Sequence, residues 1–228
     1  MNAALVSFHQ RKAVYKTMQI AVIDLGIGNL RSVEQALTTV APNANVVVTS
    51  DAQVISSADR VVMPGQGAIG TWFSALHERD LQSAVQQALS DKPMLGICVG
   101  MQALFEHSDE DGGVKGLGLF EGSVRHFSNF HNADDSGLKI PQMGWNQVTQ
   151  TQDHAMWHNI GDQSHFYFVH SYCANSSEAD QISVGQADYN HEFIAAVARD
   201  NVFAVQFHPE KSHDDGLTLL KNFTQWNG

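Results

Sequence analysis

One cysteine stands between two glycines in a pattern that could carry nucleophilic chemistry. Residues 96–102 read GICVGMQ, after the apolar segment 93–95 and before residues 103–106, which favour a helix. A strand that enters a helix through a tight turn, with the nucleophile at its tip, is a nucleophile elbow. Gly96 would let neighbouring backbone approach, and Gly100 would spare the new helix a clash. The positive end of that helix would favour the Cys98 thiolate, although a buried structural cysteine is the alternative.

A histidine and a glutamate near the end of the chain could supply the other two groups. Residues 202–207 predict a strand, and His208-Pro209-Glu210 follows it directly. Residues two apart in an extended segment point the same way, and Pro209 fixes the backbone between them. A carboxylate orients an imidazole and supports its positive form, which suggests Cys98 as nucleophile, His208 as base and Glu210 as orienter. Taken alone, the pair is equally compatible with a surface histidine and glutamate beyond a core strand.

Together the two motifs resemble those of the class I, or triad, glutamine amidotransferases. Four further segments are similar to the glutaminase subunits of imidazole glycerol phosphate synthase, an enzyme of histidine biosynthesis. These segments are DLGIGNL at 24–30, PGQGA at 64–68, PQMGWN at 141–146 and YFVHSY at 167–172. The resemblance covers about residues 18–227, and the combination is far more specific than any single motif.

The resemblance implies hydrolysis of L-glutamine to glutamate and ammonia. The thiolate would attack the side-chain carbonyl, while His208 acts as acid toward the ammonia and as base toward water. The oxyanion would be held by the backbone N–H of Val99 and by a second donor in the glycine-rich loop, Gln66 N–H beside Gly67. The family usually has valine at position 66, but a backbone donor tolerates another side chain.

Matching positions also imply a substrate-binding set, which comprises Gln102, Glu110, His170, Ser171 and Tyr172. Gln102 lies one turn after Cys98 and can face the same pocket. Glu110 matches the acidic residue that holds the substrate ammonium, with a solvated loop carboxylate as the alternative. Residues 170–172 match a strand whose backbone contacts the substrate carboxylate. We interpret His170 as structural, because His208 and Glu210 already fill the catalytic role.

A partner subunit is implied as well. Asn29, Trp145 and Lys211 match positions that face the synthase partner, although Trp145 would be equally at home in a core. Gln142 stands where the family typically has histidine. The expected partner is a (β/α)8-barrel cyclase in a heterodimer, which uses the ammonia to make imidazole glycerol phosphate and the purine precursor AICAR from the nucleotide PRFAR. Three alternatives stay open: the glutaminase of a surface-sugar amidotransferase, a cysteine hydrolase of similar fold, and a non-catalytic binding subunit.

Composition narrows the class of protein. The chain has 228 residues, 43% of them apolar, which suits one domain. A net charge of −11 without a basic stripe argues against nucleic-acid binding, and no apolar run is long enough for a membrane span. With only Cys98 and Cys173, a disulfide scaffold is not expected, so we predict a cytoplasmic protein in which Cys173 is a small buried residue. His154 and His158 are four apart but lack the other ligands of a zinc site, so we expect neither a metal nor a cofactor.

The order of predicted elements indicates an α/β fold. We expect a mostly parallel central sheet flanked by helices, with a β-rich second half; the resemblance makes this the flavodoxin-like fold of class I glutamine amidotransferases. The first half predicts strands at 19–24, 45–49, 60–63 and 94–97, with helices at 29–40 and 81–89. The second half predicts strands at 118–125, 146–149, 166–172, 182–186 and 193–197, then a helix at 216–226. Residues 1–17 are expected to be an extension, whose disorder is left open, before a glutamine amidotransferase domain at 18–228; residues 127–138 predict a mobile loop.

Overall fold

Val- and Ile-rich segments form a parallel sheet at the centre of the molecule. The computed structural model describes residues 16–130 and 139–228. The five parallel strands, in spatial order, are β2 (Asn45–Thr49), β1 (Gln19–Ile23), β3 (Arg60–Gly65), β4 (Met94–Cys98) and β13 (Val202–Val205). Every residue of β3, β4 and β13 is buried, because helices cover both faces of this part of the sheet.

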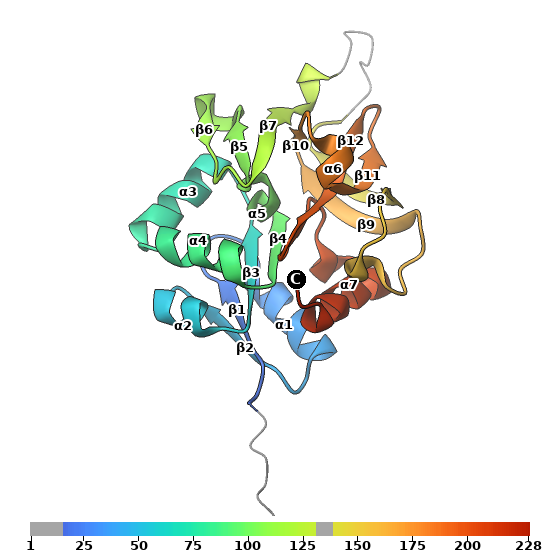
Figure 1. Cartoon of the computed structure of the whole chain (residues 1–228). Coiled ribbons are helices and arrows are strands. Elements are labelled where there is room, and N and C mark those ends of the chain that lie inside the picture. The colour runs from blue at the N-terminus through green and yellow to red at the C-terminus, as the bar shows by residue number, and fades with distance from the viewer. Residues whose placement is uncertain (1–15, 131–138) are drawn as a thin grey trace, which may run out of the picture.

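The longer helices lie in two layers. Figure 1 shows α2, α3 and α4 on one side of the parallel strands and α1 and α7 on the other. The helices are α1 (Leu30–Val40), α2 (Ala52–Ser57), α3 (Ile69–Glu78), α4 (Gln82–Asp91), α5 (Val99–Gln102), α6 (Ala179–Ile182) and α7 (His213–Gln225). In α1 the buried residues Val33, Ala36 and Leu37 form one stripe, as expected for a helix that packs one face on a sheet.

The second half of the chain extends the sheet with mostly antiparallel strands. Beyond β13 the order continues through β12 (Glu192–Arg199), β10 (Tyr172–Asn175), β7 (Phe120–His126), β5 (Phe105–Ser108) and β6 (Val114–Lys115). Three further strands, β11 (Ser183–Asp188), β8 (Gln142–Gln150) and β9 (Ser164–His170), branch from β12. Short 3-10 turns complete the chain: η1 (Glu110–Gly112), η2 (Phe127–Asn129), η3 (Ala155–Trp157) and η4 (Pro209–Lys211).

The predicted fold class is confirmed, with local corrections. The helix expected to continue over 103–106 is wrong: α5 ends at Gln102, and Phe105 begins a strand in which its ring packs 5.6 Å from that of Phe120. Helices α2 and α3 were not predicted. The first has only six residues, too few for a periodic pattern, and the side chain of Asp51 caps it. The strand expected at 166–172 is two strands, β9 and β10, separated at Ser171.

Two predicted segments lie largely or wholly outside the described residues. Residues 127–129 of the expected mobile loop form η2, whereas residues 131–138 are not described. Residues 1–15 of the expected extension are not described either.

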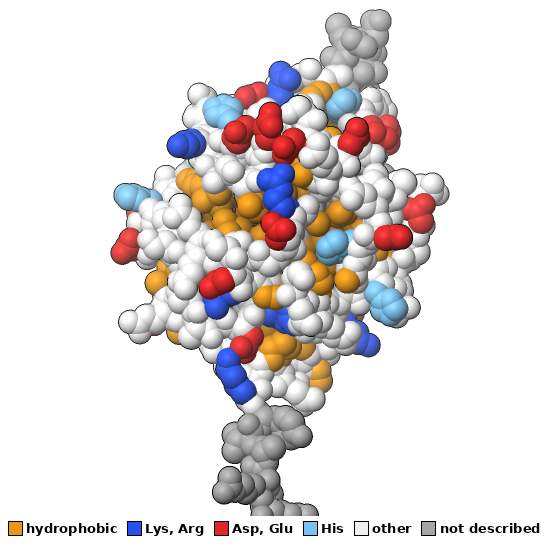
Figure 2. Space-filling view, viewed as in Figure 1, with side chains coloured by type: hydrophobic (Ala, Val, Ile, Leu, Met, Phe, Trp, Pro, Cys, Tyr) orange, Lys and Arg blue, Asp and Glu red, His pale blue; other side chains and the backbone are white. Residues whose placement is uncertain are grey.

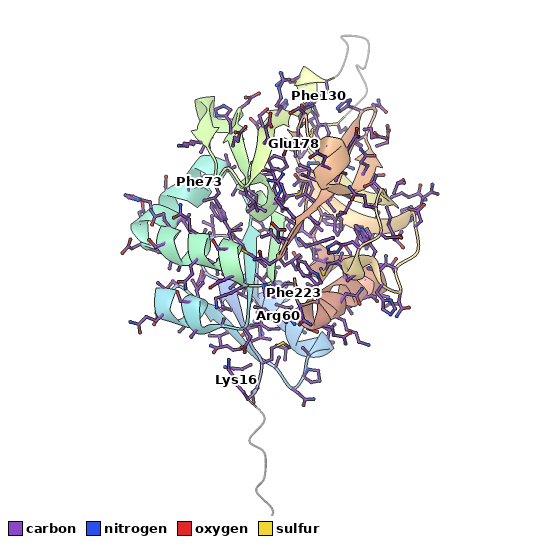
Figure 3. All side chains as sticks on the ribbon, viewed as in Figure 1. Lys16, Arg60, Phe73, Phe130, Glu178 and Phe223 are labelled. Atoms are coloured by element: carbon purple, nitrogen blue, oxygen red, sulfur yellow. The ribbon has the colours of Figure 1, made fainter. Side chains whose placement is uncertain are left out.

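Arg60 joins the start of β3 to the end of the chain. Its guanidinium donates to the carbonyl oxygen of Trp226 and to Asn227, and its Cζ lies 5.9 Å from the Phe223 ring centroid. Figure 3 shows Arg60 and Phe223 next to each other beside α7. The contact holds the C-terminal end of α7 against the start of β3.

The surface carries charges of both signs. In the face shown in Figure 2, acidic side chains cluster near the top while basic side chains stand apart from one another. Among the helices of residues 16–130 and 139–228, none is long and apolar enough to cross a membrane.

Candidate active site

Cys98 stands at a strained turn between β4 and α5. Its backbone has φ 55° and ψ −112°, a conformation that is uncommon for any residue but glycine and often marks a functional site. A Cβ at position 100 would lie 1.9 Å from the carbonyl oxygen of Met63, and one at position 96 would lie 2.9 Å from the Cβ of Ala204. The two glycines therefore let the elbow pack directly against β3 and β13.

His208 and Glu210 form a buried pair beside this elbow. Strand β13 runs parallel to β4 with Val205 opposite Ile97, so the residues that follow reach the same edge of the sheet as Cys98. Nδ1 of His208 lies 2.8 Å from Oε1 of Glu210, and each side chain is only 2% exposed. The pair expected from the spacing of these two residues is thus present, and it is not a surface pair.

The backbone around His208 is tied to β9. The N–H of His208 donates to the carbonyl oxygen of Tyr167 at 2.9 Å. The hydroxyl of Ser212 donates to the carbonyl oxygen of His208 at 2.6 Å and accepts from the N–H of Tyr167 at 3.0 Å. These bonds fix the backbone of His208, and so the position of its imidazole, beside β9.

The surroundings of His208 favour its charged form. Burial lowers the pKa of His208, but Cys98 and the Glu210 carboxylate outweigh this effect and raise it to about 9. Its Nε2 is buried and has no hydrogen-bond partner among the described residues. Because Cys98 and His208 line the same cavity, this nitrogen lies near a group that would bind beside the sulfur.

The cavity has a volume of about 510 Å³, within the range of small-molecule sites. The predicted catalytic, oxyanion and substrate-binding residues all line it, except Glu210, which is buried behind His208. Its lining is Gln66, Gly67, Cys98, Val99, Gln102, Glu110, Pro141, Tyr167, Val169, His170, Ser171, Tyr172, His208 and Lys211. Residues from most of the length of the chain therefore meet in one site.

The glycine-rich loop borders the nucleophile. Gly65 is paired with Cys98 in the β3–β4 register, and Gly67 has φ +77°. The side chain of Gln66 turns toward the loop before α1, where its Oε1 accepts from the N–H of Asn29 at 3.1 Å. Asn29 itself is exposed and caps α1 through Ser32. The loop is thus placed where its backbone could serve an oxyanion.

Two candidate substrate-binding side chains already form hydrogen bonds within the protein. Both N–H groups of Gln102 are engaged, with the carbonyl oxygen of Tyr172 at 3.1 Å and with Oε1 of Gln206 at 3.0 Å. Glu110 accepts from the N–H of Ile69 at 3.0 Å, and burial raises its pKa. Glu110 is therefore a half-buried carboxylate at the cavity wall and not a fully solvated one.

His170 is buried between two neutral hydrogen-bonding partners, with the positive charge of His208 nearby. Burial lowers its pKa to about 4. Nδ1 lies 2.7 Å from the carbonyl oxygen of Tyr172, and Nε2 lies 2.8 Å from the Gln142 amide atom assigned as Oε1, which an exchange of the two amide ends would make Nε2. A neutral imidazole that donates from Nδ1 must accept at Nε2, so Gln142 has to present its N–H there. This fully paired state supports a structural role for His170.

An aromatic cluster lies at the rim of the cavity. Trp145 is 45% exposed, which excludes the core position considered for it. Its ring stacks on His213 at 4.7 Å and meets Tyr167 edge-on at 6.0 Å. Nζ of Lys211 lies 5.8 Å from the Tyr167 ring centroid, and nearby in sequence Met143 is 65% exposed. Such exposed apolar side chains are typical of a surface that meets a partner.

The other histidine and cysteine candidates, His154 and Cys173, lie in environments that suit a structural role. His154 caps η3 by accepting from the N–H of Met156, and within the described ranges no group of His, Cys, Asp and Glu could hold a metal ion. Cys173 is fully buried, and burial raises its pKa to about 12, as suits an inert core thiol.

One functional candidate was missed from the sequence. Gln206 is completely buried, and its Nε2 lies 3.6 Å from Sγ of Cys98. Its position two residues before His208, on the same side of an extended segment, is the signal that could have found it.

Comparisons with known proteins agree with this geometry. The family model of class-I glutamine amidotransferases matches residues 21–226. Imidazole glycerol phosphate synthase subunit HisH of Pseudomonas putida is 52% identical over 209 residues, spanning 92% of this chain and 98% of that subunit. The subunit of the same name from Dechloromonas aromatica is 53% identical over 209 residues, spanning 91% and 96%. A crystal structure of a glutamine amidotransferase superimposes with a TM-score of 0.65 over 90% of this chain and 98% of its own, at 18% identity, a likeness of fold alone.

Proposed function

The chain belongs to the class I glutamine amidotransferases, among the HisH subunits of imidazole glycerol phosphate synthase, and from this premise we propose that it hydrolyses L-glutamine to glutamate and ammonia at Cys98 for histidine biosynthesis. The observation that carries the proposal is the buried His208–Glu210 pair. Its free Nε2 shares a cavity with the thiol at the tip of an elbow.

The first half of the reaction forms a thioester. The Cys98 thiolate attacks the side-chain carbonyl carbon of glutamine, and the carbonyl oxygen becomes an oxyanion that the N–H groups of Val99 and Gln66 would stabilise. With its pKa raised to about 9, His208 is protonated at neutral pH and can donate from Nε2 to the leaving nitrogen. The C–N bond breaks, ammonia leaves, and His208 becomes neutral.

The second half restores the enzyme. Neutral His208 removes a proton from water, the resulting hydroxide attacks the thioester carbon, and the C–S bond breaks to release glutamate and the thiolate. Glu210 holds Nδ1 throughout, which keeps the reactive nitrogen turned to the cavity.

The rest of the cavity supplies contacts to the α-amino and carboxylate groups of glutamine. Glu110 would hold the substrate ammonium, and Gln102 can offer only its Oε1, since both of its N–H groups are engaged. The backbone at His170, Ser171 and Tyr172 would meet the substrate carboxylate. These contacts place the side-chain amide at the sulfur.

The partner that we propose is a (β/α)8-barrel cyclase, bound in a cytoplasmic heterodimer. Ammonia released into water at neutral pH is mostly protonated and lost as a nucleophile, so the site should open into the partner. The exposed Trp145, Lys211 above Tyr167, and Asn29 beside the glycine-rich loop would contact this subunit. The cyclase would convert PRFAR into imidazole glycerol phosphate and AICAR.

The test measures glutamate formation with and without the cyclase and its nucleotide ligand, with Cys98→Ala as the blank. We expect a Cys98-dependent rate that the partner strongly stimulates. A high rate without any partner would instead indicate an uncoupled hydrolase. No activity under either condition would point to a sugar-amidating partner or to a non-catalytic subunit.

A further inference from the structure

A buried glutamine next to Cys98 has no part in the reaction described above. Gln206 is 0% exposed and directly follows β13. Since Val205 is paired with Ile97, the next residue along reaches the level of Cys98. Nε2 of Gln206 lies 3.6 Å from Sγ, within hydrogen-bonding range of a sulfur acceptor.

Gln102 fixes which end of this amide faces the sulfur. Oε1 of Gln206 accepts from Nε2 of Gln102 at 3.0 Å, and the other N–H of Gln102 is held by the carbonyl oxygen of Tyr172 at 3.1 Å. If the Gln206 amide were reversed, two NH2 groups would face each other and the sulfur would meet an oxygen. Because the pair is buried, neither mismatch could be relieved by water. The donor orientation of Gln206 therefore follows from the network.

Few other groups are placed to donate to the sulfur on this side. Helix α5 has only four residues, so the dipole that the elbow offers is that of a single turn. His208 uses Nδ1 for Glu210, and its Nε2 forms no well-aligned hydrogen bond among the described residues, although it is close enough to Cys98 for the sulfur to raise its pKa. A hydrogen bond to the anionic form of a group favours that form, and bonds to charged acceptors are stronger than neutral ones.

We propose that Gln206 is a further catalytic residue of the glutaminase, which donates Nε2–H to the Cys98 sulfur and stabilises the thiolate while Nε2 of His208 stays available for the leaving ammonia. Gln102 acts through Gln206 as a positioning residue. The proposal rests on the glutaminase function proposed above, but the contact itself can be tested without that activity.

The sharpest variant is Gln206→Glu, which keeps the size of the side chain and an acceptor for Gln102 but presents an oxygen to the sulfur. We expect alkylation of Cys98 by iodoacetamide at pH 7, followed by mass spectrometry, to slow about 10- to 100-fold, as for a lost hydrogen bond to a charged group. In the complex with the cyclase, kcat should fall by a similar factor while KM for glutamine changes less than about twofold. Cys173 provides the internal reference, because it is buried and its pKa is raised to about 12.

Gln206→Met separates the loss of the donor from charge repulsion, since it removes the N–H without adding a carboxylate. We expect Cys98 alkylation to slow about tenfold in this variant too. Gln87→Glu, the same substitution at an exposed position of α4, is the matched control and should behave as wild type. Wild-type alkylation rates in both Gln206 variants, with the Tm unchanged, would overturn the proposal.

A third measurement tests the contact without substituting Gln206, in case both Gln206 variants fail to fold. In ¹⁵N-labelled wild-type protein, the side-chain amide signals of Gln206 should shift when Cys98 is replaced by alanine, because the donor loses its acceptor. Unmoved signals would overturn the proposal. If the wild type alkylates as expected but hydrolyses no glutamine with any partner, the glutaminase assignment fails while the contact between Gln206 and Cys98 stands.

Discussion

Two buried histidines beside the same cavity differ in charge at neutral pH: one is positive and the other is neutral. On what we call the triad side, His208 lies between Cys98 and Glu210, and its pKa is raised to about 9. On what we call the amide side, His170 lies between Gln142 and the Tyr172 carbonyl, and its pKa is lowered to about 4. Both side chains have lost nearly all contact with solvent, so burial alone cannot account for the difference.

The difference teaches that the charge of the partner decides the role of each imidazole. Burial disfavours the charged form of both rings, and only an anionic neighbour reverses this effect. The triad side has a carboxylate and a thiol, whereas the amide side has neutral amide and carbonyl groups. In the proposed reaction the first ring therefore transfers protons at neutral pH, while the second stays neutral and hydrogen-bonded on both sides.

The largest effect should come from making the triad side resemble the amide side. We expect Glu210→Gln to lower kcat about 10³- to 10⁴-fold, because a neutral amide neither stabilises the imidazolium nor enforces the correct tautomer. The measurement is the glutaminase rate in the presence of the cyclase and its ligand. Glu192→Gln, at an exposed position of β12, is the matched control. A loss of less than tenfold would mean that Glu210 does not orient His208.

The raised pKa of His208 predicts an alkaline limit to stability. The folded pKa of about 9 lies above the ordinary 6.5, so this contribution is fully present below pH 6.5 and is lost as the pH rises through about 9. We expect urea unfolding at pH 6.5 and pH 9.5 to show a loss on the order of 1–3 kcal/mol. Glu210→Gln should lose less over this interval; an equal loss would assign the alkaline limit to other groups.

The lowered pKa of His170 predicts the opposite limit. Its folded pKa of about 4 lies below 6.5, so protonation favours the unfolded chain, and stability falls as the pH drops from 6.5 through about 4. The contribution should be on the order of 1–3 kcal/mol, and His170→Asn should remove it from the difference in unfolding free energy between pH 6.5 and pH 4.5. If this variant shows the same acid loss as wild type, His170 is not the group that titrates.

The smallest effect should come from removing the hydroxyl group that links the triad side to the amide side. Ser212 bonds both the His208 carbonyl and the N–H of Tyr167, which lies on the strand that ends at His170. We expect Ser212→Ala to cost about 1 kcal/mol of unfolding free energy and to lower kcat several-fold, with KM nearly unchanged. Chemical denaturation and steady-state kinetics test this; a changed KM with unchanged kcat would indicate that this hydroxyl group serves the substrate pocket instead.

Short-range sequence patterns were enough to predict much of the local geometry of the candidate site. Glycines at 96 and 100 indicated a close-packed elbow, and the two-residue spacing of His208 and Glu210 indicated a shared direction; the structure has both features. The same reasoning could not find α2 or the break at Ser171, because a six-residue capped helix and a one-residue interruption leave little periodic signal.

The sequence by itself determined the elbow, the mostly parallel central sheet and the pairing of His208 with Glu210, since these follow from backbone sterics and from residues close together in the chain. Only the tertiary structure decided that His170 is neutral, that Trp145 is exposed and that Gln206 donates to Cys98. Each of these depends on which groups a side chain meets across the fold, and local spacing does not specify the partners that residues distant in the chain will have.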